Sequence, residues 1–354
     1  MTLQRANEVV RAVNSDIGAD VAGSPQRRSS RVSLEIVIPI YNEQEVLPAL
    51  FEEFVRTFSA EARDQYGLSE VNCLFVDDGS QDASAATVSE ARPTGLGVTL
   101  LRLSRNFGHQ AAVSAGIAHS SADLIAVIDA DLQDPPGCIL EMIGRWREGY
   151  EVVYGQRRHR QEGFLKRFLY AAFYRIYRLL APIDVPVDAG DFCLLSRRAA
   201  DELNRLPEAV RFPRGLRAWI GFPQTAVEYD RPARAAGESR YGWRDLYRLA
   251  TEGIASLSLR PLQLSQLLAL IYLLLAIAGI SGLLLNVFDF TDLRTQLNLV
   301  LVITLVSNAT VLFCMYILGA YLGRTYWEVK GRPAFIVQDV VLVKRASETE
   351  PESN

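Results

Sequence analysis

Two long apolar stretches constrain the fold of this chain more than any other feature of its sequence. The first runs from Leu262 to Val287 and the second from Leu297 to Leu322, and neither contains a charged residue. Each exceeds the roughly 20 apolar residues that an α-helix needs to cross a bilayer. We therefore predict a hairpin of two transmembrane helices joined by the polar link 289–296. A pair of buried core helices is the alternative.

The charges around these stretches predict their orientation. Arginine and lysine residues precede the first stretch and follow the second, whereas the link contains only Arg294. Loops that are rich in Lys and Arg stay on the cytoplasmic side of a membrane. The first apolar run of the chain is the strand-like segment at Leu34, so no N-terminal signal peptide is expected. We predict a two-pass protein of the cytoplasmic membrane, with its N-terminal domain and both termini in the cytoplasm.

The region before the apolar stretches, 33–241, alternates between strand-like and helix-like segments. The predicted strands are 34–40, 71–77, 97–103, 124–130 and 151–155, and the predicted helices are 43–59, 82–92, 108–119 and 136–148. Continuous apolar strands that alternate with helices are typical of a parallel sheet buried on both faces. The predicted fold is therefore α/β and Rossmann-like, with a mostly parallel sheet and helices on both faces.

The remaining segments flank this domain or interrupt it. We expect a flexible extension at 1–32, an interfacial amphipathic helix at 242–260 and a cytoplasmic tail at 324–354. The segment 163–180 combines aromatic residues with four cations. It fits either a core-packing helix with a solvated basic face or a helix that lies at the membrane interface.

Carboxylates follow two of the predicted strands, at the edge of the sheet where such folds bind ligands. Asp77 and Asp78 follow the second strand, and Asp129 and Asp131 follow the fourth. The spacing of Asp129 and Asp131 places both side chains on one side of an extended segment. Oxygen ligands of this kind suit Mg²⁺ or Mn²⁺, which take substrate phosphates as further ligands. The structural alternative is that Asp and Pro end a strand here, and "VDDGS" on its own fits a turn better than a site.

Several classes of function are disfavoured by what the sequence lacks. The formal net charge of −4 gives no general reason to expect a nucleic-acid partner. No G-x-G-x-x-G follows a predicted strand and there is no Walker loop, which argues against a dinucleotide-dependent oxidoreductase and a P-loop enzyme. The three histidines are too few for a histidine-rich metal site, and the four cysteines have no metal-ligand spacing.

The motifs of the N-terminal domain carry a family resemblance. In chain order they are "VIPIYNEQEVLPAL", "VDDGSQD", "LSRNFGHQAAVSAGI", "DADLQDPP", "VYGQR" and "DAGDFCLLSRR". This order and spacing resemble family 2 glycosyltransferases with the GT-A fold, from about residue 33 to residue 332. The likeness is greatest to the branch that transfers a sugar to a polyprenyl phosphate, which includes dolichyl-phosphate mannose synthase and bacterial GtrB-type glucosyltransferases. The implied architecture is a GT-A domain followed by the transmembrane hairpin.

The resemblance implies roles for particular residues. Contacts with the nucleotide sugar are implied for Pro39, Tyr41, Asn42, Glu43, Asp77, Asp78, Asp129 and Gln133. Asp129 and Asp131 are also the implied ligands of an Mg²⁺ or Mn²⁺ ion. Binding of the acceptor phosphate is implied for Arg157, Arg160, Arg211, Arg214 and Arg240. Asp191, Asp131 and Arg157 are the expected catalytic residues, with Asp188 as an alternative to Asp191. His109 is expected to be a wall or packing residue.

The implied reaction moves a hexose, by likeness glucose from UDP-glucose, onto undecaprenyl or dolichyl phosphate by an inverting displacement. The second pKa of a phosphate monoester lies near 6, so this acceptor needs a general base less than a sugar hydroxyl does. Asp191 is therefore expected to matter either as a base or by orienting the sugar. Membrane lipids are expected partners, and a homo-oligomer, with a tetramer as one option, is the expected assembly.

Other functions stay open at this point. A mannose synthase that uses GDP-mannose is the first alternative, and a lipid acceptor such as diacylglycerol is another. A processive polysaccharide synthase is disfavoured because the chain has no Q-x-x-R-W motif and few spans. From a different class, the chain would be a non-catalytic membrane adaptor with a degenerate transferase domain, although Asp129 and Asp131 are both present.

Overall fold

The computed structural model describes residues 30–158, 189–208, 211, 213–230, 260–284 and 293–343. Several predictions fall outside these residues. They are the extension before residue 30, the segment 163–180, the interfacial helix up to residue 259, and the candidate site residues Arg160, Asp188 and Arg240.

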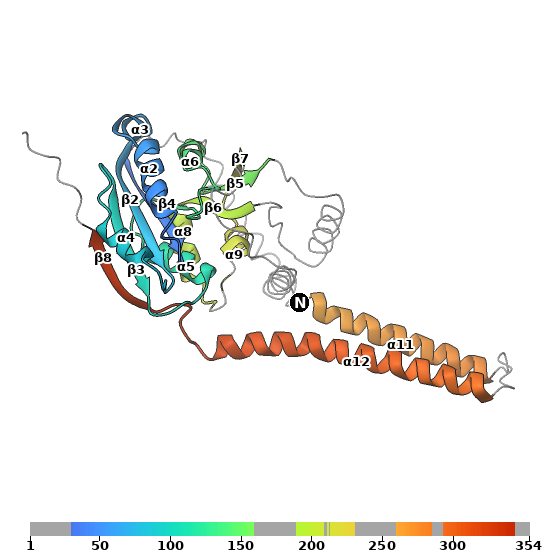
Figure 1. Ribbon diagram of the computed structural model, residues 1–354. Coiled ribbons are helices and arrows are strands. Elements are labelled where there is room, and N and C mark those ends of the chain that lie inside the picture. Colours follow the sequence, from blue (N-terminus) through green and yellow to red (C-terminus); the bar gives the residue numbers. More distant parts are fainter. Residues whose placement is uncertain are drawn as a thin grey trace, which may run out of the picture.

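The described residues of the domain form an eight-stranded sheet with the order β7-β5-β6-β4-β1-β2-β3-β8 (Figure 1). The strands are β1 Val32–Ile40, β2 Leu68–Asp77, β3 Gly97–Leu103, β4 Leu124–Val127, β5 Val152–Arg157, β6 Ala189–Ser196, β7 Gln224–Tyr229 and β8 Val337–Val343. β4, β1, β2 and β3 are parallel neighbours, and β5 is parallel to β7. β6 is antiparallel to both of its neighbours, and β8 is antiparallel to β3. The predicted mostly parallel sheet is confirmed.

Helices cover both faces of the sheet because its central strands are apolar on both sides. α2 Leu47–Thr57, α4 Ser84–Glu90 and α6 Gly137–Arg147 pack on one face, and α5 His109–His119 and α8 Arg197–Arg205 pack on the other. Alternate residues of β1 show the division, since Ile36 and Ile38 join the first core and Val37 joins the second. Two buried cores therefore hold the sheet rigid from both sides.

Two predicted elements differ from the structure in ways that matter for the site. The helix predicted at 43–59 begins only at Leu47, and a separate helix, α3 Ala60–Gln65, follows it, with its first turn capped by the Ser59 side chain. The strand predicted at 124–130 ends at Val127. Asp129 and Asp131 therefore lie in the loop after β4, not on an extended strand as predicted.

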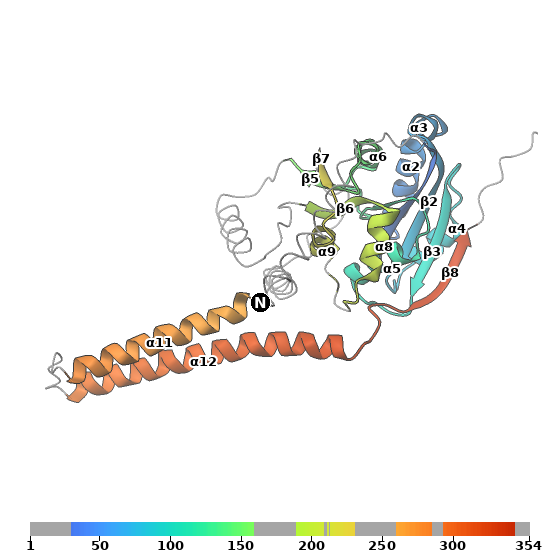
Figure 2. The same ribbon diagram turned by 180° about the vertical axis from the view of Figure 1, so that it is seen from behind.

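Two long helices leave the domain and lie side by side (Figures 1 and 2). They are α11 Arg260–Leu284 and α12 Leu293–Val329, and the hydroxyls of Tyr272 and Thr310 lie 2.8 Å apart between them. Within the described residues, one helical segment is long and apolar enough to cross a membrane, Val300–Val329, judged by its length and composition. In α11 the described residues contain a shorter apolar stretch, Ser265–Ala278. The transmembrane hairpin therefore stays a prediction.

The chain returns from α12 to the sheet, which was not predicted. β8 lies within the expected tail and pairs with β3 from Leu103 opposite Val337 to Val98 opposite Val343. Arg102 of β3 donates to Asp339 of β8, with 2.7 Å between Nε and Oδ1. Exposed and less exposed residues alternate along β8, as expected for a strand with one face on the domain.

Gly116 lets α5 approach the sheet closely, and this contact gives a test of the fold. A Cβ built on Gly116 would lie 2.2 Å from Cγ1 of Val37, whereas a Cβ on Gly144 of α6 would meet nothing within 4 Å. We expect Gly116→Ala to lower the free energy of unfolding by about 1–3 kcal/mol, because overpacking a core costs this much. Gly144→Ala should raise it by about 0.5–1 kcal/mol, as expected for Ala in place of Gly in a helix. Thermal unfolding of the two variants in detergent measures both; equal midpoints would contradict the packing of α5.

Candidate active site

The loops after β1 and β2 are fastened together at the carboxyl edge of the sheet. The N–H of Asn42, which has φ 56°, donates to Ser80 Oγ at 3.0 Å, and Asn42 Oδ1 accepts from the N–H of Gln81 at 2.8 Å. The N–H of Glu43 donates to Ser84 Oγ at 2.8 Å. The predicted nucleotide residues Pro39, Tyr41 and Glu43 lie at the end of β1 and in the loop that these bonds fix.

Asp77 and Asp78 use their carboxylates to hold this edge together. Asp77 Oδ1 accepts from the N–H of Ser80 at 2.9 Å, which closes the turn. The two oxygens of Asp78 accept from the N–H groups of Phe107 and Gly108, at 2.7 and 2.9 Å. Burial raises the pKa of Asp78 even though these bonds oppose the shift. The structure shows the turn that "VDDGS" predicts, and contact of either carboxylate with a base or ribose stays a prediction.

Asp129 and Asp131 lie in a tight loop between β4 and α6. Leu132 has φ 58°, and the N–H of Gln133 donates to Asp131 Oδ1 at 3.1 Å. Burial raises the pKa of Asp129 to about 6, and the carboxylates of Asp191, Asp134 and Asp131 add to this shift. The charge of His109 opposes it. About a third of the Asp129 side chain, 34%, is exposed. Burial is the larger cause of the raised pKa, ahead of the neighbouring carboxylates.

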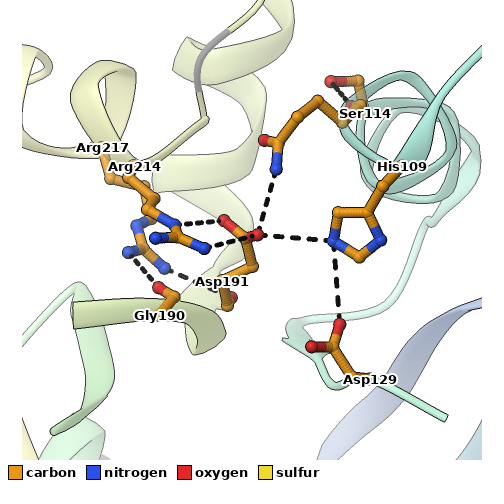
Figure 3. A network of polar contacts seen from close by, with 8 residues as sticks. His109, Ser114, Asp129, Gly190, Asp191, Arg214 and Arg217 are labelled. Carbon is orange, nitrogen blue, oxygen red and sulfur yellow. Dashed lines mark hydrogen bonds and ion pairs between the residues drawn. The ribbon is translucent and has the colours of Figure 1, made fainter. Parts of the chain in front are cut away.

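Asp191 is the centre of a polar network that joins four elements (Figure 3). It lies on β6 with 6% of its side chain exposed. Arg214, from α9 Pro213–Trp219, donates to both carboxylate oxygens, with distances of 2.9 and 3.1 Å. Gln110 Nε2 donates to Oδ2 at 3.0 Å, and His109 Nε2 lies 3.3 Å from the same oxygen. On its other side, His109 Nε2 lies 3.7 Å from Asp129 Oδ1, so this ring links Asp191 to the loop after β4.

The network determines the charge of its members. Burial alone would raise the pKa of Asp191, but Arg214 and His109 outweigh it and hold that pKa well below the usual range. Burial lowers the pKa of His109, but its bond to Asp191 and the charge of Asp129 outweigh this and raise it above 6.5. At neutral pH Asp191 is an anion whose oxygens already accept hydrogen bonds. The carboxylate is thus built to hold cations in place and is a poor proton acceptor.

The predicted phosphate-binding arginines divide into two groups. A Cβ built on Gly190 would lie 3.7 Å from Arg157 Nη2, so Arg157, like Arg214, lies beside the network. Its Nε also donates to the hydroxyl of Tyr229 at 3.4 Å. Arg211 instead donates to the carbonyl of Leu206 at 2.9 Å, just after α8. The structure therefore shows Arg211 in a backbone contact, and binding of the acceptor phosphate by Arg211 stays a prediction.

Three residues of the network had no predicted catalytic or binding role. His109 was expected to be a wall or packing residue, and Gln110 was not considered, although both stand in the quoted motif "LSRNFGHQAAVSAGI". Arg217 is buried and donates to the carbonyl of Gly190 at 2.9 Å. A polar pair at the start of a helix that follows a parallel strand is the signal that could have located the first two.

The described residues fit a metal ion that takes part of its ligands from a substrate. Within the parts of the chain that the structure describes, no three His, Cys, Asp or Glu side chains gather into a complete cation site. The two carboxylates of the loop after β4 are hard oxygen donors, and the carboxylates of Asp134 and Asp191 lie near enough to Asp129 to raise its pKa. Mg²⁺ and Mn²⁺ suit such incomplete oxygen sites, because they keep waters and bind substrate phosphates.

The described residues form a mostly parallel α/β sheet with carboxylates and arginines gathered at its carboxyl edge. The family profile described as "Glycosyl transferase family 2" matches residues 35–203. Together with relatives that are 40% and 33% identical over nearly their whole length, this match shows that the chain belongs to the family and is a glycosyltransferase with a GT-A-like fold, which confirms the family resemblance.

Relatives match over most of their length. "Uncharacterized glycosyltransferase YkcC" of Bacillus subtilis is 40% identical over 88% of this chain and 94% of the relative. "Prophage bactoprenol glucosyl transferase homolog" of Escherichia coli is 33% identical over 87% of this chain and 99% of the relative. "Bactoprenol glucosyl transferase" of Shigella phage SfII is 33% identical over 87% and 98%. The similarity therefore includes the long C-terminal helices as well as the catalytic domain.

Proposed function

We propose that the chain transfers glucose from UDP-glucose to a polyprenyl phosphate at the cytoplasmic face of a membrane. The observation that carries this proposal is the 33% identity, over 87% of the chain, with proteins named for bactoprenol glucosyl transfer. The apolar segment Val300–Val329 supports it, because an acceptor with a long hydrocarbon chain stays in the bilayer.

The proposed chemistry is a single displacement at the anomeric carbon. A phosphate oxygen of the acceptor forms the new bond, and the bond to the UDP oxygen breaks on the opposite face, with its electron pair leaving on the diphosphate. A phosphate monoester is largely a dianion near pH 7, since its second pKa is about 6. This nucleophile gives up no proton, so the hydrogen-bonded carboxylate of Asp191 is not needed as a base.

The protein's own residues bring two negatively charged substrates together. Arg214 and His109 lie on either side of Asp191, which fixes the position of the guanidinium group and of the imidazole ring. In the proposal, Arg214 and Arg157 contact the acceptor phosphate, since guanidinium groups bind phosphate oxygens in a bidentate manner. The loops after β1 and β2 hold the nucleotide. Asp129 and Asp131 would hold Mg²⁺ or Mn²⁺, which would neutralise charge on the leaving diphosphate.

Transfer into a lipid fraction tests the proposal. Purified protein in detergent is given undecaprenyl phosphate, Mg²⁺ and labelled UDP-glucose, GDP-mannose or UDP-N-acetylglucosamine in parallel. We expect label to enter the lipid only from UDP-glucose, and to remain in solution when the free polyprenol replaces its phosphate. Label from another donor would refute the sugar assignment. Equal transfer to the free alcohol would refute the phosphate acceptor.

A further inference from the structure

The C-terminal end of α12 carries a small cluster of aromatic and basic side chains. Lys330 Nζ lies 4.4 Å from the ring centre of Tyr326 and 5.3 Å from that of Trp327. The two rings are in contact, edge to face, and are 55% and 51% exposed. We call these three residues the collar. Large exposed aromatic rings are costly in water. The same rings suit the boundary between lipid and water, where a neighbouring Lys can keep its charged end in water.

The collar lies at the depth of a lipid headgroup layer if α12 crosses the bilayer. Leu322 is the last residue of the uncharged apolar stretch, and Arg324 follows it. Tyr326 and Trp327 are four and five residues beyond Leu322, which is about 6–8 Å along a helix. The headgroup layer on each side of a bilayer is about 5–8 Å thick, from the difference between the hydrocarbon core and the whole bilayer. Lys330, Arg324 and Arg332 complement the anionic phosphates of that layer.

The sheet topology decides which edge of the domain lies next to the collar. Only a short segment separates Lys330 from Val337, the first residue of β8. Val337 pairs with Leu103, the last residue of β3, and the N–H of Ser104 donates to the carbonyl of Ile336 at 2.9 Å. β3 is parallel to its neighbour β2, so β8 begins at the carboxyl edge of the sheet. Asp78, Asp129 and the network around Asp191 lie along that edge. Figures 1 and 2 show α12 joining β8 at this end of β3.

We propose that the collar lies in the headgroup layer of an anionic bilayer and, through β8, holds the carboxyl edge of the sheet towards that layer. This inference rests on the membrane attachment in the proposed function. It adds the depth of the chain in the bilayer and the direction that the active site faces. The pairing of β8 with β3 and the ion pair between Arg102 and Asp339 make β8 a rigid connection between α12 and the sheet.

The direction of the sheet can be measured without catalysis. Ser104 follows the carboxyl end of β3 and Ser69 lies at the amino end of β2, and both are exposed. Each is changed to Cys and spin-labelled in a protein that carries Cys138→Ala and Cys314→Ala, since Cys73 and Cys193 are buried. The full chain is placed in vesicles of phosphatidylcholine and phosphatidylglycerol that contain a lipid-tethered nickel chelate. We expect the nickel to relax the spin label at residue 104 faster than the label at residue 69, because the proposal places residue 104 nearer to the headgroups. Equal or reversed rates would overturn the orientation.

The depth of the collar has its own measurement. In the same vesicles, lipids brominated near the headgroup or near the chain end quench tryptophan at matching depths. The emission that Trp327→Phe removes should be quenched more by the shallow bromines. The emission removed by the control Trp146→Phe, which changes a buried residue near the end of α6, should be quenched by neither. Trp327 emission that neither lipid quenches would overturn the inference, as would a chain that does not remain with the vesicles. A chain with the expected labelling that transfers no sugar would refute the proposed function alone.

Discussion

Asp129→Asn is expected to abolish most of the sugar transfer while the domain remains folded. A bound cation contributes several kcal/mol to the stabilisation of a leaving group, which corresponds to a loss of about 10²–10³-fold in rate when its ligand is removed. The measurement is transfer of glucose into the lipid fraction with saturating Mg²⁺. Asp201→Asn is the control, because Asp201 pairs with Arg197 on α8, outside the site. Transfer by Asp129→Asn at the rate of the control would refute the metal assignment.

The same variant should be more stable than the wild type in the absence of metal. The pKa of Asp129 is raised to about 6 in the folded state, so its ionisation costs folding free energy as the pH rises. Between about pH 4 and 6, Asp129 holds its proton in the native state but has lost it in the unfolded state, so the wild type loses stability as the pH rises through this range. Allowing for partial exposure, we expect Asn to gain about 1 kcal/mol at pH 7.5. Thermal unfolding in EDTA measures this gain, and added Mg²⁺ should raise the midpoint of the wild type only. A variant less stable than the wild type at pH 7.5 would contradict the raised pKa of Asp129.

Arg214→Met is expected to have the largest effect on stability. It leaves the nearly buried carboxylate of Asp191 with Gln110 and His109 but without its bidentate partner. Breaking a buried ion pair costs about 3–5 kcal/mol, and the partial exposure of Arg214 reduces this to about 2–3 kcal/mol. The midpoint of thermal unfolding should fall by about 5–10 °C, from about 2–4 °C per kcal/mol for a domain of this size.

The control and the pH dependence separate this ion pair from a general effect of losing an arginine. Arg205→Met breaks an exposed pair with Glu202 and should cost less than about 1 kcal/mol. The pKa of Asp191 is depressed in the fold, so its contribution is complete above the unfolded value of about 4 and is lost as the pH falls. The difference between wild type and Arg214→Met should therefore shrink below about pH 4. A difference that does not change with pH would mean that Arg214 acts through packing alone.

The sequence was sufficient to predict the central half of the sheet. β1, β2 and β3 are long runs of buried residues, and such runs separated by helices have few alternatives to a parallel sheet. The carboxylates after β2 and β4 could be placed at one edge for the same reason. The strands that close the sheet could not be predicted. β6 is antiparallel to both neighbours, and β8 reaches the sheet only after two long helices.

The site was predicted less completely than the fold because its partners come from distant segments. Asp191 and Arg214 are 23 residues apart, and Gln110 is 81 residues from Asp191. No spacing rule links them, and only the packing of α5 and α9 beside β6 brings them together. The same holds for Arg211, where the sequence indicated a cation and the fold determined that its partner is a backbone carbonyl.

The pairing of β8 with β3 determines an order of events during synthesis. Arg102 and Asp339 are 237 residues apart, so the ribosome releases β3 long before its outer neighbour exists. Until then β3 presents unpaired backbone groups, which are a template for association with other chains. α12 precedes β8 in the chain and leaves the ribosome first. The catalytic domain can therefore complete its sheet only after both long helices have been made, so the last step of its folding waits for nearly the whole chain.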